Sequence, residues 1–141
     1  ISLVSPRLRD GFNNNGPDSV PQQLAYNRYS VGVIRYKAPD DRFAEHIDHC
    51  NEANGWVILL SLGCTARFMV AGPSDTAYRT IDMLSGDILL FDPSSQAAIR
   101  HGVASIVVSS CPSSLIEAFG DNLMGNYRYG VQCRTSLQNS T

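Results

Sequence analysis

Apolar residues along this chain fall into short segments separated by turn residues, and few segments have the length of a helix. Residues 30–36 alternate between apolar and polar side chains, as a strand with one buried face does. Residues 56–62 form a continuous run rich in aromatic and branched apolar side chains, which is typical of a buried strand. Further strands are expected over residues 42–48, 66–70, 78–83, 88–91, 103–109 and 127–135, and one helical turn within residues 115–119.

The spacing of the turns indicates the fold class. Gly and Pro, together with Asn, Asp and Ser, occupy the intervals between the expected strands, for example at Gly72-Pro73 and at Asp92-Pro93. About eight strands with turn signals roughly every 8–12 residues are typical of an antiparallel β-sandwich. The pattern therefore predicts an all-β protein with minor helix, built as a jelly roll.

Length and composition describe one globular domain. The chain has 141 residues, of which 43% are apolar and 17% charged, so it can bury a core. Residues 10–23 hold clustered Gly, Asn and Pro and predict a loop, so residues 1–33 are expected to form an N-terminal extension. Residues 34–135 would form the core and residues 136–141 a tail. The chain begins with Ile1, and we expect it to be part of a longer protein.

Charge and cysteine content limit the environment and the partners. A net charge of −2 excludes a global basic field that would capture nucleic acid. Lys37 is the only lysine, so the other cations are arginines, which fork onto carboxylates and phosphates. No apolar run reaches transmembrane length, so we expect no membrane association. We also expect a monomer. The chain has four cysteines without CxxC spacing, namely Cys50, Cys64, Cys111 and Cys133. We expect them to be reduced thiols of a cytoplasmic or nuclear protein. The alternative is that they serve only as small buried side chains.

The segment His46-Ile47-Asp48 places two potential metal ligands two residues apart. On a strand such side chains point to the same face, so both can reach one ion. His101, at the start of a later strand, can supply a third ligand. Two histidines and one carboxylate form the facial triad that holds iron(II) and leaves coordination positions open. An ordinary His–Asp pair at the end of a surface strand is the alternative that these residues leave open.

Five stretches follow one another in an order that identifies a family. They are Tyr36-Lys37-Ala38-Pro39, His46-Ile47-Asp48 with Glu52, residues 58–63 (ILLSLG), residues 85–91 (SGDILLF) with 100–103 (RHGV), and residues 128–134 (RYGVQCR). Together they resemble the AlkB-like family of iron(II)- and 2-oxoglutarate-dependent dioxygenases. The resemblance covers residues 34–135 and implies a double-stranded β-helix.

The resemblance also implies a reaction. His46, Asp48 and His101 would bind the catalytic iron(II), and dioxygen and 2-oxoglutarate would be consumed to hydroxylate an inert C–H bond. On an N-methylated base of DNA or RNA, the hydroxymethyl product would release formaldehyde, which is oxidative demethylation. Neighbouring groups should orient both imidazoles. His49 and Asp87 are candidates for this role, although Asp87 is more typical of a turn.

The resemblance implies that three further residues bind 2-oxoglutarate. Arg128 would fork onto the distal carboxylate, and Arg134 would lie near the carboxylate beside the keto group. Positions 128 and 134 differ by an even number, so both side chains can face the same side of one strand. Tyr36 would offer its hydroxyl to the same molecule. The alternative for Arg128 and Arg134 is that they are solvated charges on a strand, and the alternative for Tyr36 is that it is a core aromatic.

Several positions depart from the family's pattern and leave the substrate open. Ile34 stands where the family often has Asn, and Gly130 and Gln132 replace an Asn and a Thr of the closing strand. Cys50 stands where nucleic-acid repair members carry an acidic residue that reads the base. Residues 1–33 are short for the family's nucleotide-clamping flap and would be at most a remnant of it.

These departures permit three readings of the function. The first is demethylation of bases; the second is the same oxygenase chemistry on a protein or small molecule; the third is a binding module without turnover. The complete set of metal and cosubstrate residues argues against the third. Phe43 and Trp56 could stack a flipped base, but aromatics on strands usually belong to the core.

Overall fold

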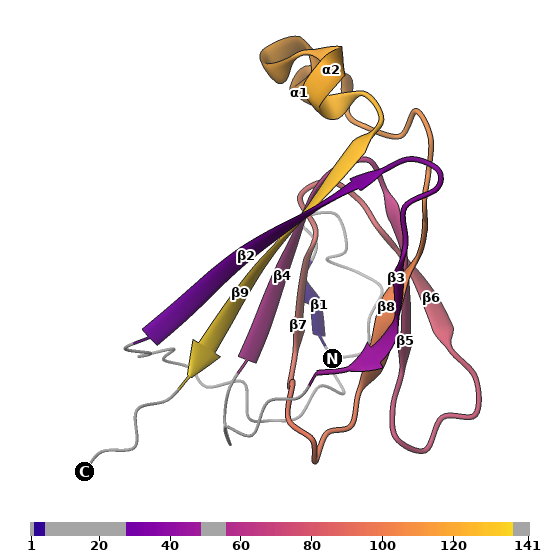
Figure 1. Ribbon diagram of the computed structural model, residues 1–141, viewed down its shortest axis with the longest axis vertical. Helices are drawn as coiled ribbons and strands as arrows, with labels where there is room; N and C mark the ends of the chain where they lie inside the picture. The colour runs from indigo at the N-terminus through magenta and orange to yellow at the C-terminus, as the bar shows by residue number, and fades with distance from the viewer. Residues whose placement is uncertain (1, 5–27, 49–55, 137–141) are drawn as a thin grey trace.

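Two antiparallel β-sheets face each other in the computed structural model, which describes residues 2–4, 28–48 and 56–136 (Figure 1). Within these residues, the five-stranded sheet has the spatial order β1 (Ser2–Val4), β7 (Ile88–Phe91), β4 (Trp56–Gly63), β9 (Tyr127–Ser136) and β2 (Arg28–Lys37). The four-stranded sheet has the order β3 (Phe43–Ile47), β8 (Arg100–Ile106), β5 (Ala66–Ala71) and β6 (Arg79–Met83). The predicted all-β jelly roll is therefore confirmed.

Two short helices connect β8 to β9 and project from one end of the sandwich (Figure 1). Helix α1 (Ser113–Phe119) includes the helical turn that the sequence predicts, whereas α2 (Asp121–Met124) was not expected. Gly120 separates the helices with a φ of 89°, a left-handed conformation that glycine adopts at little cost. No helix in the described segments is long and apolar enough to cross a membrane.

Strand β8 begins three residues earlier than expected. It spans Arg100–Ile106 rather than residues 103–109, so His101 lies inside the strand. Backbone pairing to two neighbours extends it, because Arg100 is opposite Ile47 of β3 and Ala71 of β5. The apolar pattern of β8 alone does not reveal these partners, which explains the shifted boundary.

The core fills the space between the two sheets. Val57, Leu89 and Phe91 contribute from the five-stranded sheet, and Phe68 and Met83 from the four-stranded sheet, all at 3% exposure or less. Full burial of side chains of this size stabilises the fold by about 1.5–3 kcal/mol each. This close-packed interior fixes the two sheets relative to each other, and with them the residues that face inward from both.

Some predicted features can be assigned directly. Asp87 accepts a hydrogen bond from the Leu84 backbone N–H at 2.8 Å, which confirms its role in the turn before β7. The described cysteines are free thiols, with Cys64 and Cys111 buried and Cys133 partly buried. Apart from Ser2–Val4, residues 28–33 and Ser136, the expected N-terminal extension (1–33) and tail (136–141) lie outside the described residues. His49, Cys50 and Glu52 lie outside them as well.

Candidate metal centre

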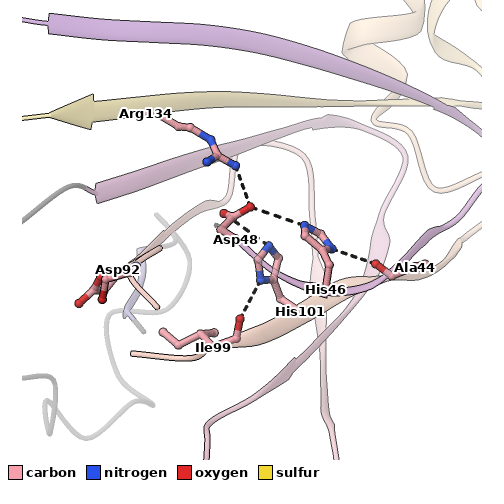
Figure 2. Close-up of polar contacts among 8 residues, drawn as sticks. Ala44, His46, Asp48, Asp92, Ile99, His101 and Arg134 are labelled. Carbon is pink, nitrogen blue, oxygen red and sulfur yellow. Dashed lines mark hydrogen bonds and ion pairs between the residues drawn. The ribbon is translucent and has the colours of Figure 1, made fainter. Parts of the chain in front are cut away.

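Strands β3 and β8 bring the three predicted metal ligands together. His46 lies opposite His101 in the pairing of the two strands, and Asp48 follows directly after β3 (Figure 2). One ligand atom from each residue lies within 4.8 Å of the others, so the three could hold one metal ion. Asp48 and His101 are buried, at 7% and 6% exposure, whereas His46 is partly exposed.

Both imidazole rings are oriented by backbone carbonyls. His46 Nδ1 donates to the carbonyl of Ala44 at 2.9 Å, and His101 Nδ1 donates to that of Ile99 at 3.2 Å (Figure 2). Because a carbonyl only accepts, each Nδ1 carries the proton and each Nε2 keeps its lone pair. Both Nε2 atoms face Asp48, at 3.7 Å for His46 and 3.9 Å for His101. This is the arrangement that metal-ligating histidines need, and it arises from carbonyls that carry no sequence signal.

The Asp48 carboxylate has one oxygen paired and one unpaired. Arg134 Nη2 donates to Oδ1 at 2.7 Å (Figure 2). Oδ2 is buried and has no hydrogen-bond partner among the described residues. An unpaired buried carboxylate oxygen is costly, and a divalent cation beside the two Nε2 atoms would remove that cost. The donor set of two imidazoles and one carboxylate therefore fits iron(II).

Burial lowers the pKa of His101 below its usual value of 6.5. The hydrogen bond to Ile99 and the charge of Asp48 oppose this shift, whereas His46 and Arg134 reinforce it. A lowered pKa keeps the imidazole neutral over a wider pH range. The neutral imidazole is the form that binds metal.

A cavity of about 240 Å³ lies between the sheets at this site. It brings together every predicted site residue. Those residues are Tyr36, His46, Asp48, His101, Arg128 and Arg134. Apolar side chains from both sheets supply much of the remaining wall, among them Leu59, Phe68 and Phe91. A cavity with a few converging polar groups in an apolar wall is typical of a small-molecule site.

Arg128 is a buried cation that faces this cavity. It is 1% exposed, its guanidinium lies 5.2 Å from the centre of the Tyr36 ring, and Nε donates to Ser61 Oγ at 3.3 Å. Nη2 is buried and has no partner within the described segments. A buried guanidinium with an unused N–H fits an anionic ligand such as the distal carboxylate of 2-oxoglutarate. Burial raises the pKa of Tyr36 despite the opposing charge of Arg128, so its hydroxyl remains a donor.

The inward face of β9 carries both predicted arginines. Residues 128, 130, 132 and 134 all line the cavity, as their even spacing predicts. A Cβ at Gly130 would lie 2.9 Å from Arg128 Nη1, so glycine leaves room for the guanidinium. With its amide oxygen turned toward Arg134, Gln132 accepts from Nε at 3.2 Å and from Nη2 at 3.1 Å. Two departures from the family's pattern thus accommodate the arginines.

Sequence reasoning missed two contacts of these arginines. Ser61 and Gln132 hydrogen-bond Arg128 and Arg134, yet neither was singled out for such a role. The available signal for Ser61 is a polar residue inside an otherwise apolar strand. For Gln132 the available signal is its position two residues before Arg134, which puts both side chains on the same face of the strand. Of the two aromatics considered for base stacking, Phe43 lines the cavity and Trp56 is absent from its lining.

Comparison with known proteins identifies the family. The model of the 2OG-Fe(II) oxygenase superfamily matches residues 20–134. This match covers most of the chain, and the chain belongs to the 2OG-Fe(II) oxygenase superfamily. The expected cofactors, iron(II) and 2-oxoglutarate, are those that define the superfamily, and the triad could bind the iron.

Individual relatives support the AlkB-like resemblance. The N6-methyladenosine RNA demethylase ALKB1 of Pyricularia oryzae is 29% identical over 113 residues, which are 70% of this chain and 29% of that protein. The N6-methyladenosine RNA demethylase ALKBH of Cryphonectria parasitica is 25% identical over 108 residues, which are 67% of this chain and 46% of that protein. The solved structure of OsALKBH1 superposes with a TM-score of 0.58 at 27% identity, covering 72% of this chain and 47% of that chain. The chain thus spans less than half the length of each of these relatives.

Proposed function

We propose that this chain is the catalytic core of an iron(II)- and 2-oxoglutarate-dependent dioxygenase that demethylates N-methylated bases in nucleic acid. One observation carries the proposal. A single cavity contains two buried, unpaired polar atoms, Asp48 Oδ2 and Arg128 Nη2. The first belongs to a group suited to a cation, and the second to a group suited to an anion. An iron ion with a bound dicarboxylate satisfies both requirements.

Each predicted site residue has a defined part in this proposal. His46, Asp48 and His101 hold the iron(II), with the imidazoles fixed by their backbone carbonyls. Arg128 binds the distal carboxylate of 2-oxoglutarate, and Tyr36 donates its hydroxyl to the same molecule. Arg134 holds Asp48 through its 2.7 Å hydrogen bond and presents its remaining N–H groups near the proximal carboxylate.

The cofactors supply the oxidation, and the protein supplies geometry. When bound, iron(II) with 2-oxoglutarate and dioxygen would supply the oxidation of an N-methyl group to N-hydroxymethyl, with succinate and carbon dioxide as co-products. The N-hydroxymethyl group then loses formaldehyde and leaves an N–H. Leu59, Phe68 and Phe91 give the cavity apolar walls, which would limit the access of water to a bound substrate.

The substrate that we propose to test first is N6-methyladenosine in RNA. Two relatives bear that activity in their names, and their alignments cover 70% and 67% of this chain. With a net charge of −2, affinity for RNA has to come from local cations rather than from a global field. Exposed Arg35 and Arg42 are available on the described surface for phosphate contacts.

The test is succinate formation with iron(II), 2-oxoglutarate and ascorbate. It compares no oligonucleotide, an RNA oligonucleotide with one N6-methyladenosine, the unmethylated RNA, and DNA with N6-methyladenine. We expect the methylated RNA to stimulate succinate formation, with formaldehyde released in equal amount, and His101→Ala to abolish both. No succinate from folded, iron-loaded protein would contradict the dioxygenase proposal. Succinate without stimulation by any of these oligonucleotides would exclude N6-methyladenine in RNA or DNA as the substrate.

A further inference from the structure

Strand β3 contains a β-bulge beside the metal centre. Phe43 lies opposite Val103 of β8, and His46 lies opposite His101. Three steps along β3, from 43 to 46, therefore match two steps along β8, from 103 to 101. The extra residue of β3 interrupts the regular ladder. Bulges of this kind re-aim side chains next to functional sites.

The bulge brings Phe43 to the same side as His46. In a regular strand, residues three apart point to opposite faces of the sheet. Here both side chains line the cavity. Their rings meet edge to face, with centroids 4.6 Å apart and an interplanar angle of 71°. The bulge thus places an aromatic ring directly against a proposed iron ligand.

Gly102 of β8 makes the bulge possible. A Cβ at Gly102 would lie 2.7 Å from the Phe43 carbonyl oxygen and 3.2 Å from the carbonyl carbon of Ala44, and backbone atoms cannot yield as a flexible side chain can. The carbonyl oxygen of Ala44 also accepts the hydrogen bond from His46 Nδ1. The same local distortion therefore orients the imidazole and presents Phe43.

Phe43 is not a core residue. It is 39% exposed although it borders the cavity, so a considerable part of its ring remains in contact with water. Ile34 of β2 lines the same cavity from the other sheet and is 38% exposed. Val31 and Val33 alternate with Ile34 along β2 and do not line the cavity. The mouth of the cavity thus has an apolar side chain on each sheet, one of them a flat ring.

We propose that Phe43 is a substrate-contact residue that stacks against a planar heteroaromatic base, with Ile34 as the apolar wall on the opposite sheet. This inference rests on the proposed function and specifies its substrate as a flat ring rather than an aliphatic amine. A base stacked on Phe43 lies next to His46 and therefore close to the metal. Stacking on aromatic side chains is a general means of holding an unpaired base.

The experiment measures the Michaelis constant (KM) for the N6-methyladenosine RNA and, separately, the equilibrium affinity for the same RNA by fluorescence anisotropy without oxygen. The variants are Phe43→Ala, Phe43→Leu and Phe43→Trp. Phe119→Ala is the matched control, since Phe119 lies on α1 at 57% exposure and is not part of the cavity lining. Thermal unfolding verifies that each variant is folded, and Phe43→Leu preserves apolar bulk should Phe43→Ala fail to fold.

We expect Phe43→Ala and Phe43→Leu to raise both the KM and the dissociation constant for the RNA roughly tenfold, which corresponds to the loss of one base–aromatic stack. Phe43→Trp should stay within about threefold of the wild type, since the indole also stacks. Wild-type constants for folded Phe43→Leu or Phe43→Ala would overturn the inference while leaving the dioxygenase proposal intact. If the wild type binds the RNA but does not demethylate it, the dissociation constants of the Phe43 variants alone test whether Phe43 contacts the base. Wild type that neither binds nor oxidises the RNA would overturn both the stacking inference and the choice of N6-methyladenosine in RNA as the substrate.

Discussion

Arg134 donates a hydrogen bond from Nη2 to Asp48 Oδ1 at 2.7 Å and thereby joins the two sheets at the candidate metal centre. Arg134 lies on β9 and Asp48 follows β3, so their contact spans the sandwich. Gln132 accepts from Nε and Nη2 of the same guanidinium. Arg134 thus has an acceptor on its own strand and another on the facing sheet. The arrangement fixes the carboxylate that is proposed to bind iron.

Replacing Arg134 by Met should therefore destabilise the metal-free protein. The variant leaves Asp48, which is 7% exposed, without its charged partner. Loss of a hydrogen bond to a buried charged group costs about 1–3 kcal/mol, and we expect the lower part of this range because the Arg134 side chain is 39% exposed. Added iron(II) should reduce the deficit, because the metal gives the carboxylate another partner. Urea unfolding with and without iron measures both effects.

A matched surface pair serves as the control for Arg134. Arg67 Nε lies 4.0 Å from Asp82 Oδ1, with side chains that are 58% and 63% exposed. Arg67→Met should change the free energy of unfolding by less than about 1 kcal/mol, as is usual for exposed ion pairs. Equal destabilisation by the two substitutions would show that Arg134 has no special part in holding Asp48.

Arg128→Lys should raise the KM for 2-oxoglutarate roughly tenfold or more, because lysine keeps the charge but loses the forked pair of donors. Steady-state kinetics with varied 2-oxoglutarate measures this change. Arg79→Lys is the matched control, since the Arg79 side chain is 81% exposed and is not part of the cavity lining. An unchanged KM in folded Arg128→Lys would contradict the assignment of Arg128 to the distal carboxylate.

Ser61→Ala tests whether the orientation of Arg128 depends on its buried hydroxyl partner. Ser61 is 0% exposed and accepts from Arg128 Nε at 3.3 Å. The variant keeps the cation but removes this acceptor, so we expect a smaller rise in the KM for 2-oxoglutarate, roughly two- to tenfold. A rise as large as that of Arg128→Lys would mean that the hydroxyl contacts the cosubstrate itself. No rise would mean that packing alone orients the guanidinium.

The sequence predicts the strands and the ligand set well because both depend on local pattern. Alternation identifies β2, and the spacing of His46 and Asp48 follows from strand geometry. The β3 bulge could not be foreseen, because it depends on how β3 meets Gly102 of a distant strand. A regular strand would place Phe43 on the face opposite His46. The expected monomer and the cytoplasmic or nuclear location stay predictions.

Pairing across the sandwich is the other information that local pattern lacks. Ser61 and Arg128 are 67 residues apart, and Arg134 and Asp48 are 86 apart. The family resemblance suggested what the arginines bind, but it did not suggest which residues of this chain orient them. Gly130 and Gln132 depart from the family's pattern, and only the structure shows that they accommodate Arg128 and Arg134.

The metal-free protein should lose stability as the pH falls below about 6.5, the usual pKa of a solvated histidine. Burial lowers the pKa of His101 in the folded state, so the unfolded chain takes up the proton first. The free energy of unfolding therefore decreases as the pH falls from 6.5 toward the folded-state pKa and levels off below it. Urea unfolding across this range, compared between wild type and His101→Gln, isolates the contribution of His101. Identical slopes in the two proteins would show that His101 does not cause the loss.

Gly102→Ala should destabilise the protein and weaken its iron binding together. The new Cβ would lie 2.7 Å from the Phe43 carbonyl oxygen, and relief requires movement of the bulge backbone, at a cost of about 1–3 kcal/mol. Because the Ala44 carbonyl that orients His46 belongs to the same bulge, the movement should also disturb a metal ligand. Gly32→Ala is the matched control, since no atom lies within 4 Å of its added Cβ, and it should be neutral or slightly stabilising. Thermal unfolding and calorimetric iron titration measure the two effects. Iron affinity that stays at the wild-type value in a destabilised Gly102→Ala protein would show that the bulge supports Phe43 without orienting His46.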